Sequence, residues 1–233
     1  MLISIHQPEF MPWAGFFDKI AMAEQFVILD SVQFQKGYFH NRCRIKQKGQ
    51  AHWLTVPVVK DSLDTVISEI RVHDAPNWGK KCYKSFQFHY CNAPFWQDHE
   101  AFLRRTFCEL HWERLVDLNL SILEYLCGYL ELPFRYLRSS ELALSSSGSD
   151  LVLDICRRCA ATNYLSGAHG REYLDVSAFA KAGVQVTFQE YQPVAYSQFN
   201  GPYVGPLSII DLLLNHGPGG KAILLEGRAT RCA

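Results

Sequence analysis

The stretch LISIHQPEFMPWAGFFDKIAMAEQFVILD, residues 2–30, indicates the class of fold. Its apolar run LISIHQ (2–7) predicts a buried strand, GFFDKIAMAEQ (15–25) predicts a helix, and FVILD (26–30) predicts a second buried strand. Two apolar strands joined by a helix form a βαβ unit, and the strands of such a unit are parallel. Ligands of parallel sheets bind outside the carboxyl ends of the strands, so the loop after the first strand is a candidate site.

The same alternation of strand and helix continues in the second half of the chain. The predicted elements are the strands FRYLRSS (134–140), TNYLSG (162–167) and VQVTFQEY (184–191), and the helices LVLDICRRCAA (151–161), GREYLDVSAFAKAG (170–183) and LSIIDLLLNHG (207–217). We therefore expect an α/β fold, with a mainly parallel sheet and helices on both faces. This layout is Rossmann-like and is similar to that of nucleotidylyltransferases, although their H-x-G-H signature is absent.

Residues 31–130 interrupt this alternation with mixed extended and helical patterns. RIKQ (44–47) and AHWLTVPVV (51–59) predict a hairpin that turns at KG (48–49), and ISEIRVH (67–73) predicts another strand. We expect one domain over residues 1–233, in which residues 31–130 form an insertion over the carboxyl edge of the sheet.

The composition excludes several classes of protein. The 233 residues include 23 Lys+Arg and 23 Asp+Glu, so the net charge provides no general attraction to nucleic acid or membranes. No apolar run approaches the ~20 residues that span a bilayer, and the start MLISIH lacks the features of a signal peptide, which predicts a cytoplasmic protein. The eight cysteines are scattered and are expected to be free thiols. The nine histidines are dispersed, so no metal site is predicted.

The loop after the first predicted strand is the first candidate site. His6 ends this strand, and Asp30 ends the neighbouring one. The helix that follows His6 directs its free N–H groups toward the same crevice, where they favour a phosphate. Gln7, Trp13 and Lys19 belong to the same loop and helix. The alternative is structural: the histidine caps the strand and the tryptophan packs the loop.

The segment from Ser31 to Lys60 contains no Asp or Glu but six basic residues, Arg44 among them. This pattern concentrates positive potential beside the same crevice, although an ordinary basic surface is the alternative. Basic side chains interleaved with rings such as those of Tyr38 and Phe39 can hold phosphates and stack a flat ring. WGKKCYK (78–84) adds further lysines beside a tryptophan. The candidates in these segments are Gln33, Lys36, Asn41, Arg42, Lys46, Trp78 and Lys81.

Two loops after later predicted strands give further candidates. YLSGAHGREYLD (164–175) contains glycines that let the backbone approach a ligand, and FQEYQPVAYSQFNG (188–201) carries several hydrogen-bonding side chains. Turn formation alone also explains the glycines and prolines of both loops. The candidates are Ser166, Gly167, Tyr173, Asp175, Gln189 and Gln198.

Several blocks together resemble the ordered signature blocks of the WbqC-like protein family. They include IHQPEFMPWAGFFDKI, ILDSVQFQKGYFHNRCRIK, WLTVPV, YLSGAHGREYLD and LSIIDLLLNHGP, and they extend from residue 3 to about residue 218. The chain departs from the family at Cys82, where related sequences tend to carry a histidine. The resemblance implies a role in the biosynthesis of bacterial surface polysaccharides, notably O-antigen. It also implies acylation of an amino sugar with glycine or a related aminoacyl group.

On this resemblance we expect an N-acyltransferase that acts on a dTDP- or UDP-linked amino sugar. His6 or Asp30 is the expected base, and Asn41, Gln33 or the amides around Gly167 are the expected oxyanion donors. The acyl donor stays open, with ATP plus an amino acid, an aminoacyl-tRNA or a thioester as alternatives, and a homodimer is also open. The alternative functions are an ATP-dependent ligase or nucleotidyl-transfer enzyme and a non-catalytic nucleotide-sugar-binding accessory protein.

Overall fold

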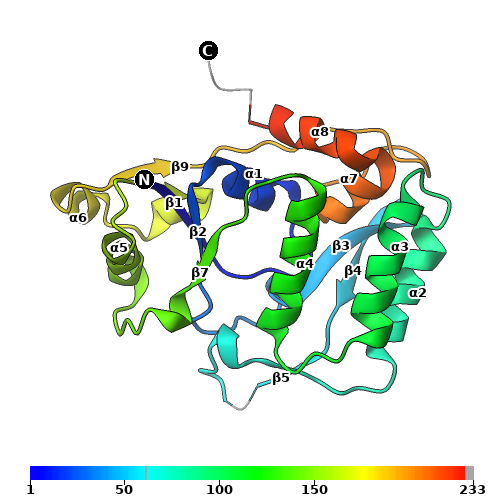
Figure 1. Cartoon of the computed structure of the whole chain (residues 1–233), viewed down its shortest axis with the longest axis horizontal. Helices are drawn as coiled ribbons and strands as arrows, with labels where there is room; N and C mark the ends of the chain where they lie inside the picture. Colours follow the sequence, from blue (N-terminus) through cyan, green and yellow to red (C-terminus); the bar gives the residue numbers. More distant parts are fainter. Residues whose placement is uncertain (61, 229–233) are drawn as a thin grey trace.

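The computed structural model of the chain describes residues 1–60 and 62–228, and its centre is a five-stranded sheet. The strands are β1 (Leu2–His6), β2 (Gln25–Ile28), β7 (Tyr136–Arg138), β8 (Asn163–Ser166) and β9 (Gln185–Phe188). Their order is β7-β2-β1-β8-β9, and every neighbouring pair is parallel (Figure 1). The predicted α/β class with a parallel sheet is confirmed.

Helices cover both faces of this sheet (Figure 1). They are α1 (Ala14–Met22), α4 (Leu115–Tyr129), α5 (Gly148–Arg158), α6 (Val176–Lys181), α7 (Ile209–His216) and α8 (Gly220–Glu226). Phe26 and Ile28 of β2 share a hydrophobic cluster with α1, α4, α7 and α8, whereas Val27 shares a second cluster with α5 and α6. Successive side chains of a strand point to opposite faces, so both faces of the sheet are buried.

The strand order reverses between β1 and β8. From β1 the chain continues to β2 and β7 on one side, and from β8 it continues to β9 on the other. The register pairs Ser4 with Leu165, so the carboxyl ends at His6 and Ser166 lie side by side. Such a reversal opens a crevice above the strand ends, which is the usual ligand site of an open α/β sheet.

The hairpin predicted in the insertion is confirmed. β3 (Arg42–Gln47) and β4 (Gln50–Thr55) pair antiparallel on either side of Lys48 and Gly49. These two residues have φ of 48° and 76°, and positive φ at both positions is what a tight two-residue turn of a twisted hairpin needs. The other elements of the insertion are β5 (Val58–Val59), η1 (Ile67–Glu69), β6 (Arg71–Val72), α2 (Trp78–Tyr90), α3 (Trp96–Arg104) and the π-helical turn η2 (Arg105–Glu109).

Some predicted elements differ from the structure. Residues 67–73 form the short turn η1 and the two-residue strand β6 rather than one strand. The helix predicted from residue 170 begins only at Val176, because the Asp175 carboxylate accepts two backbone N–H groups of the first turn and fixes the start there. α8 follows the helix that was predicted to close the chain. The remaining short turns are η3 (Ser139–Glu141), η4 (Ala168–Glu172) and η5 (Gly217–Gly219).

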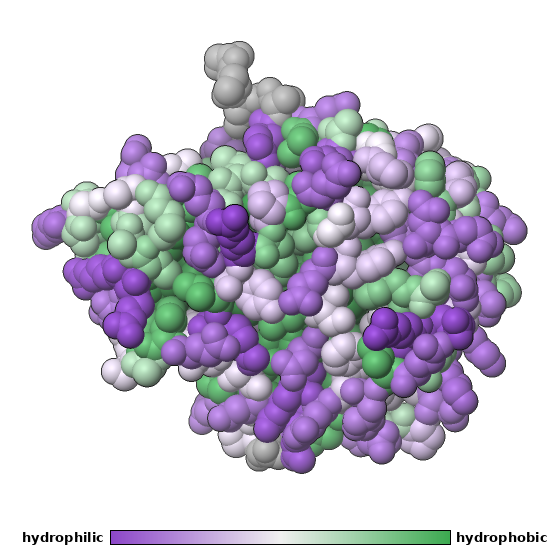
Figure 2. All heavy atoms as spheres, in the orientation of Figure 1, coloured by the Kyte–Doolittle hydropathy of each residue, from purple (hydrophilic) through white to green (hydrophobic). Residues whose placement is uncertain are grey.

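The seven cysteines within residues 1–60 and 62–228 are unpaired, and Cys232 lies outside the described residues. Cys156 is buried in the cluster under α5, in agreement with a packing role. No helix in the described part of the chain is long and apolar enough to cross a membrane. On the face drawn in Figure 2, hydrophilic and hydrophobic side chains are interspersed.

Candidate functional site

A cavity of about 380 Å³ opens where the strand order reverses. Its lining comes from residues 6–19 after β1, 38–44 leading into β3, 167–169 after β8, and 189–208 after β9. The sheet thus supplies the carboxyl ends of three strands, β1, β8 and β9, and β3 supplies part of the outer wall. Residues 31–130 were predicted to lie over the carboxyl edge of the sheet. Within this segment, β3 lies at that edge, whereas α4 packs on the face of the sheet.

Glu9 and Lys19 place opposite charges in this cavity. They are only 4% and 2% exposed, and Glu9 Oε2 and Lys19 Nζ have no hydrogen-bond partner among the described residues. Burial raises the pKa of Glu9 to about 7, although the charge of Lys19 opposes this shift. Burial lowers the pKa of Lys19 to about 8, against the opposing charges of Glu9 and Asp18. Buried charges without partners cost free energy, so both groups indicate a site that a polar ligand completes.

His6 presents a neutral imidazole to the same cavity. Its Nδ1 lies 2.9 Å from the carbonyl oxygen of Gln7. A carbonyl oxygen only accepts hydrogen bonds, so Nδ1 carries the proton and Nε2 carries the free lone pair. Burial holds the pKa of His6 well below its ordinary value, and the charges of Lys19 and His40 lower it further. The ring is therefore neutral at neutral pH, with a lone pair at Nε2 that can accept a proton, although the lowered pKa makes it a weaker base than a free imidazole.

Aromatic rings form much of the wall. The Trp13 and Tyr191 rings meet edge to face, with centroids 5.5 Å apart, and both line the cavity. Tyr38 and Phe39 line it from the segment before β3, and Arg44 lines it from β3 itself. A flat ring can stack on such a wall while an anion meets the guanidinium group.

Trp53 extends this wall to the protein surface, where it is 40% exposed. Its ring centroid lies 5.4 Å from that of Phe39. The guanidinium carbons of Arg42 and Arg44 lie 4.0 Å and 5.6 Å from the centroid of the Trp53 ring. These contacts place two cations and an accessible ring at the rim of the cavity.

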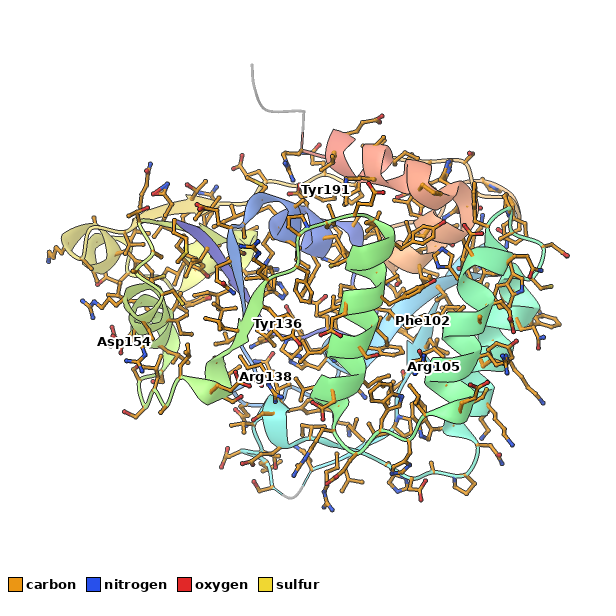
Figure 3. All side chains as sticks on the ribbon, viewed as in Figure 1. Phe102, Arg105, Tyr136, Arg138, Asp154 and Tyr191 are labelled. Carbon is orange, nitrogen blue, oxygen red and sulfur yellow. The ribbon has the colours of Figure 1, made fainter. Side chains whose placement is uncertain are left out.

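Gln189 ties the segment after β9 to α1. Its side-chain amide donates to Asp18 Oδ2 at 2.7 Å and to the carbonyl oxygen of Gly15 at 2.8 Å. Arg228 Nε donates to the other oxygen of the buried Asp18 carboxylate, also at 2.7 Å. Tyr191, two residues further on, lies close to α1 in Figure 3. This set of bonds fixes one wall of the cavity.

Five of the predicted site residues line the cavity together: His6, Trp13, Lys19, Gly167 and Gln189. His6 ends β1, Trp13 and Lys19 lie at the start of α1 and within it, and Gly167 and Gln189 directly follow β8 and β9, so the two halves of the parallel sheet meet in one site. A Cβ added to Gly167 would lie 3.7 Å from Lys19 Nζ, which shows how closely the end of β8 approaches the ammonium group.

Asp30 has a structural role and does not line the cavity, which corrects its expected role as a base. Its side chain is fully buried and accepts from Arg138 Nε at 2.8 Å, from the backbone N–H and the hydroxyl of Ser140 at 2.9 Å each, and from the Ser139 hydroxyl at 3.2 Å. Arg138 lies at the end of β7 in Figure 3. Asp30 thus joins the carboxyl ends of β2 and β7.

Other predicted residues also lie outside the cavity lining. Asn41 donates to a backbone carbonyl after β4 at 2.8 Å, Lys46 donates to the carbonyl of Pro202 at 2.7 Å, and Gln198 donates to buried Asp211 at 2.8 Å. β3 runs past the cavity, so only Arg44 of its basic residues reaches the lining. The remaining candidates outside the lining are Gln7, Gln33, Lys36, Arg42, Trp78, Lys81, Ser166, Tyr173 and Asp175.

Glu9 and Arg44 line the cavity but were not among the predicted site residues. A signal for Glu9 was present, because it is an acid between Pro8 and Phe10, three residues after the apolar strand β1 ends at His6. A carboxylate in such surroundings needs either a partner or a ligand. Within the described ranges, no group of three or more His, Cys, Asp or Glu side chains is placed to hold a metal ion.

One of the comparisons with known proteins shows the family of the chain. A model of the WbqC-like protein family matches residues 7–223, so the chain belongs to this family. The chain is also similar to a Mycobacterium tuberculosis protein named Uncharacterized protein Rv1507c, with 32% identity over 217 residues that cover 92% of this chain and 94% of the relative. That name assigns no activity. No solved structure matches the chain significantly.

The buried charges of Glu9 and Lys19 should make the ligand-free protein less stable than a variant that lacks both charges. We expect the double variant Glu9→Gln/Lys19→Met to raise the free energy of unfolding by about 1–3 kcal/mol at pH 7.5, because it removes both buried charges at once. Urea unfolding followed by circular dichroism measures this change.

The pH dependence gives the control for this variant. Because burial raises the pKa of Glu9, this residue destabilises the folded protein increasingly as the pH rises from about 4.5 to 7, and fully above pH 7. Because burial lowers the pKa of Lys19, this residue destabilises the folded protein fully up to about pH 8 and less above it. The gain should therefore be largest between pH 7 and 8 and smaller at pH 5. A double variant that is less stable than the wild type at pH 7.5 would show that the two charges are paired after all.

Proposed function

We propose that the chain is an N-acyltransferase that transfers glycine or another aminoacyl group to the amino group of a nucleotide-linked amino sugar. The proposed setting is bacterial surface-glycan (O-antigen) biosynthesis, for which family membership is the support. The observation that carries the chemical part is the presence of neutral His6 and the unpaired Lys19 ammonium group in one cavity. The first group can accept a proton and the second can stabilise a developing negative charge.

The reaction needs a neutral amine. As the amine nitrogen of the sugar attacks the carbonyl carbon of an activated ester or thioester, its proton passes to His6 Nε2. The carbonyl oxygen gains negative charge in the tetrahedral intermediate, and the Lys19 ammonium group stabilises it. The bond to the leaving group then breaks, and His6 returns the proton to the leaving group.

The rim of the cavity suits the nucleotide part of the acceptor. Arg44 lines the cavity and can meet the diphosphate of a dTDP- or UDP-linked sugar. Tyr38 and Trp53, which are 36% and 40% exposed, offer rings for the base to stack on. Here Arg44 takes the role that the sequence assigned to Arg42 and Lys46.

Transfer from a glycyl thioester to a UDP- or dTDP-linked amino sugar tests the proposal, with the acylated product measured by mass spectrometry. We expect His6→Ala to lower the rate by about 10²-fold or more, because it removes the proton acceptor. Lys81→Ala is the matched control, because this lysine is exposed on α2 and lies outside the cavity lining. Equal activity of His6→Ala and the wild type would contradict the mechanism.

The same reagents separate the alternatives. Release of pyrophosphate from ATP in the presence of glycine, without a thioester, would identify an ATP-dependent ligase. Tight binding of the nucleotide sugar without any transfer from ester or thioester donors would identify an accessory binding protein. Both results would contradict the proposed acyltransferase.

A further inference from the structure

Glu9 has no role in the proton and charge transfers described above. It is nevertheless buried, unpaired at Oε2, and part of the lining of the same cavity as Lys19. Because Lys19 Nζ has no hydrogen-bond partner among the described residues, the two groups are not hydrogen-bonded to each other, although the charge of each shifts the pKa of the other. Each charge is therefore available to a ligand.

We propose that Glu9 and Lys19 form a subsite for the zwitterion of a small α-amino acid. The Glu9 carboxylate binds the α-ammonium group, and the Lys19 ammonium group binds the carboxylate or, in an acyl donor, the carbonyl oxygen. This inference deepens the proposed function, on which it rests, by assigning the recognition of the transferred group to two residues.

The charges favour a zwitterion over ligands that carry one charge. An anion alone would satisfy Lys19 but would lie near the Glu9 carboxylate, and a cation alone would lie near the Lys19 ammonium group. A zwitterion meets both groups with charge-assisted hydrogen bonds, which are stronger than neutral ones. It also adds no net charge to a buried site.

The surroundings favour a small ligand. Gly167 lines the cavity without a side chain, and a Cβ added there would lie 3.7 Å from Lys19 Nζ. Phe16 and Met11 contribute apolar surface to the same lining. Such walls supply few hydrogen bonds to a polar side chain of the ligand, so glycine is the probe that fits the proposal most simply.

Calorimetric titration with three probes tests the subsite: glycine, acetate and methylamine. We expect glycine to bind at least about tenfold more tightly than either probe with one charge, because two charge-assisted bonds replace one. In the Glu9→Gln variant, the affinity for glycine should fall about tenfold, and the affinity for acetate should stay the same or rise. In the Lys19→Met variant, the affinities for glycine and for acetate should both fall. Glu109→Gln is the matched control, because Glu109 is an exposed partner of Arg104 on η2.

The outcomes separate this inference from the proposed function. Glycine binding that depends on Glu9, without any transfer to amino sugars, would support the subsite and overturn the acyltransferase. Transfer at equal rates from glycyl and acetyl thioesters, unchanged in Glu9→Gln, would overturn the subsite and leave the acyltransferase in place. Equal affinity for glycine and acetate in the wild type would also overturn the subsite.

Discussion

Replacing Lys19 with methionine (K19M) is expected to lower kcat by about 10²–10³-fold and to leave KM for the nucleotide sugar nearly unchanged. In the proposed mechanism the ammonium group contacts the acyl group and stabilises the negative charge that grows on its carbonyl oxygen in the transition state, and it does not contact the nucleotide sugar. Its loss should therefore lower kcat without changing KM for the nucleotide sugar. Steady-state kinetics over a range of nucleotide-sugar concentrations separates the two effects.

The charge-preserving variant Lys19→Arg is the control for this prediction. Burial lowers the pKa of Lys19 to about 8, so the wild-type rate should fall as the pH rises above about 8 and the ammonium group loses its proton. Arginine stays protonated throughout this range, so the variant should retain part of the activity and lose the alkaline decline. A K19M enzyme with normal kcat and a raised KM would instead assign Lys19 to ground-state binding.

Removing the Asp30 carboxylate (Asp30→Ala) is expected to lower the free energy of unfolding by about 3–5 kcal/mol. The substitution leaves Arg138, which is 24% exposed, without the carboxylate 2.8 Å from its Nε, and it removes the acceptor of the Ser140 N–H and hydroxyl groups. The junction of β2 and β7 would lose its polar connection. Urea unfolding with circular dichroism detection measures the change.

Asp154→Ala is the matched control for the Asp30 variant. Asp154 lies on α5 (Figure 3). It pairs with Arg157 at 3.1 Å, but their side chains are 35% and 57% exposed. An ion pair in water contributes little, so the control should change stability by less than about 1 kcal/mol. If both variants lost the same small amount, the buried network around Asp30 would not be a stabilising element of the fold.

The fold was predictable because its signals are local. The apolar run around Ile3 and Ile5, the helix that follows and the run around Val27 specify a βαβ unit within thirty residues. The Lys48–Gly49 turn specifies the hairpin in the same way. Residues 67–73 misled the prediction because alternating apolar residues also occur in an irregular segment that packs into the core, where Ile67 and Ile70 are buried.

The site was only partly predictable because it is assembled from distant segments. His6, Lys19 and Gly167 follow from the rule that ligands bind at strand ends. Sequence alone cannot show which of Arg42, Arg44 and Lys46 reaches the cavity, because that choice depends on how β3 crosses the edge of the sheet. It also cannot distinguish a carboxylate that is paired within the protein, such as Asp30, from one that lacks a partner at Oε2, such as Glu9.

Two separate segments of the chain contribute to the cavity and its rim, residues 6–19 and residues 38–53. The side chains that the proposed mechanism uses, His6 and Lys19, belong to the first nineteen residues, whereas the rings proposed to stack the base, Tyr38 and Trp53, belong to the hairpin and the segment just before it. If the proposed mechanism holds, the preference for a base can change through this segment and hairpin while the residues of the transfer step stay the same. Swapping that hairpin between family members should transfer nucleotide preference from one protein to the other.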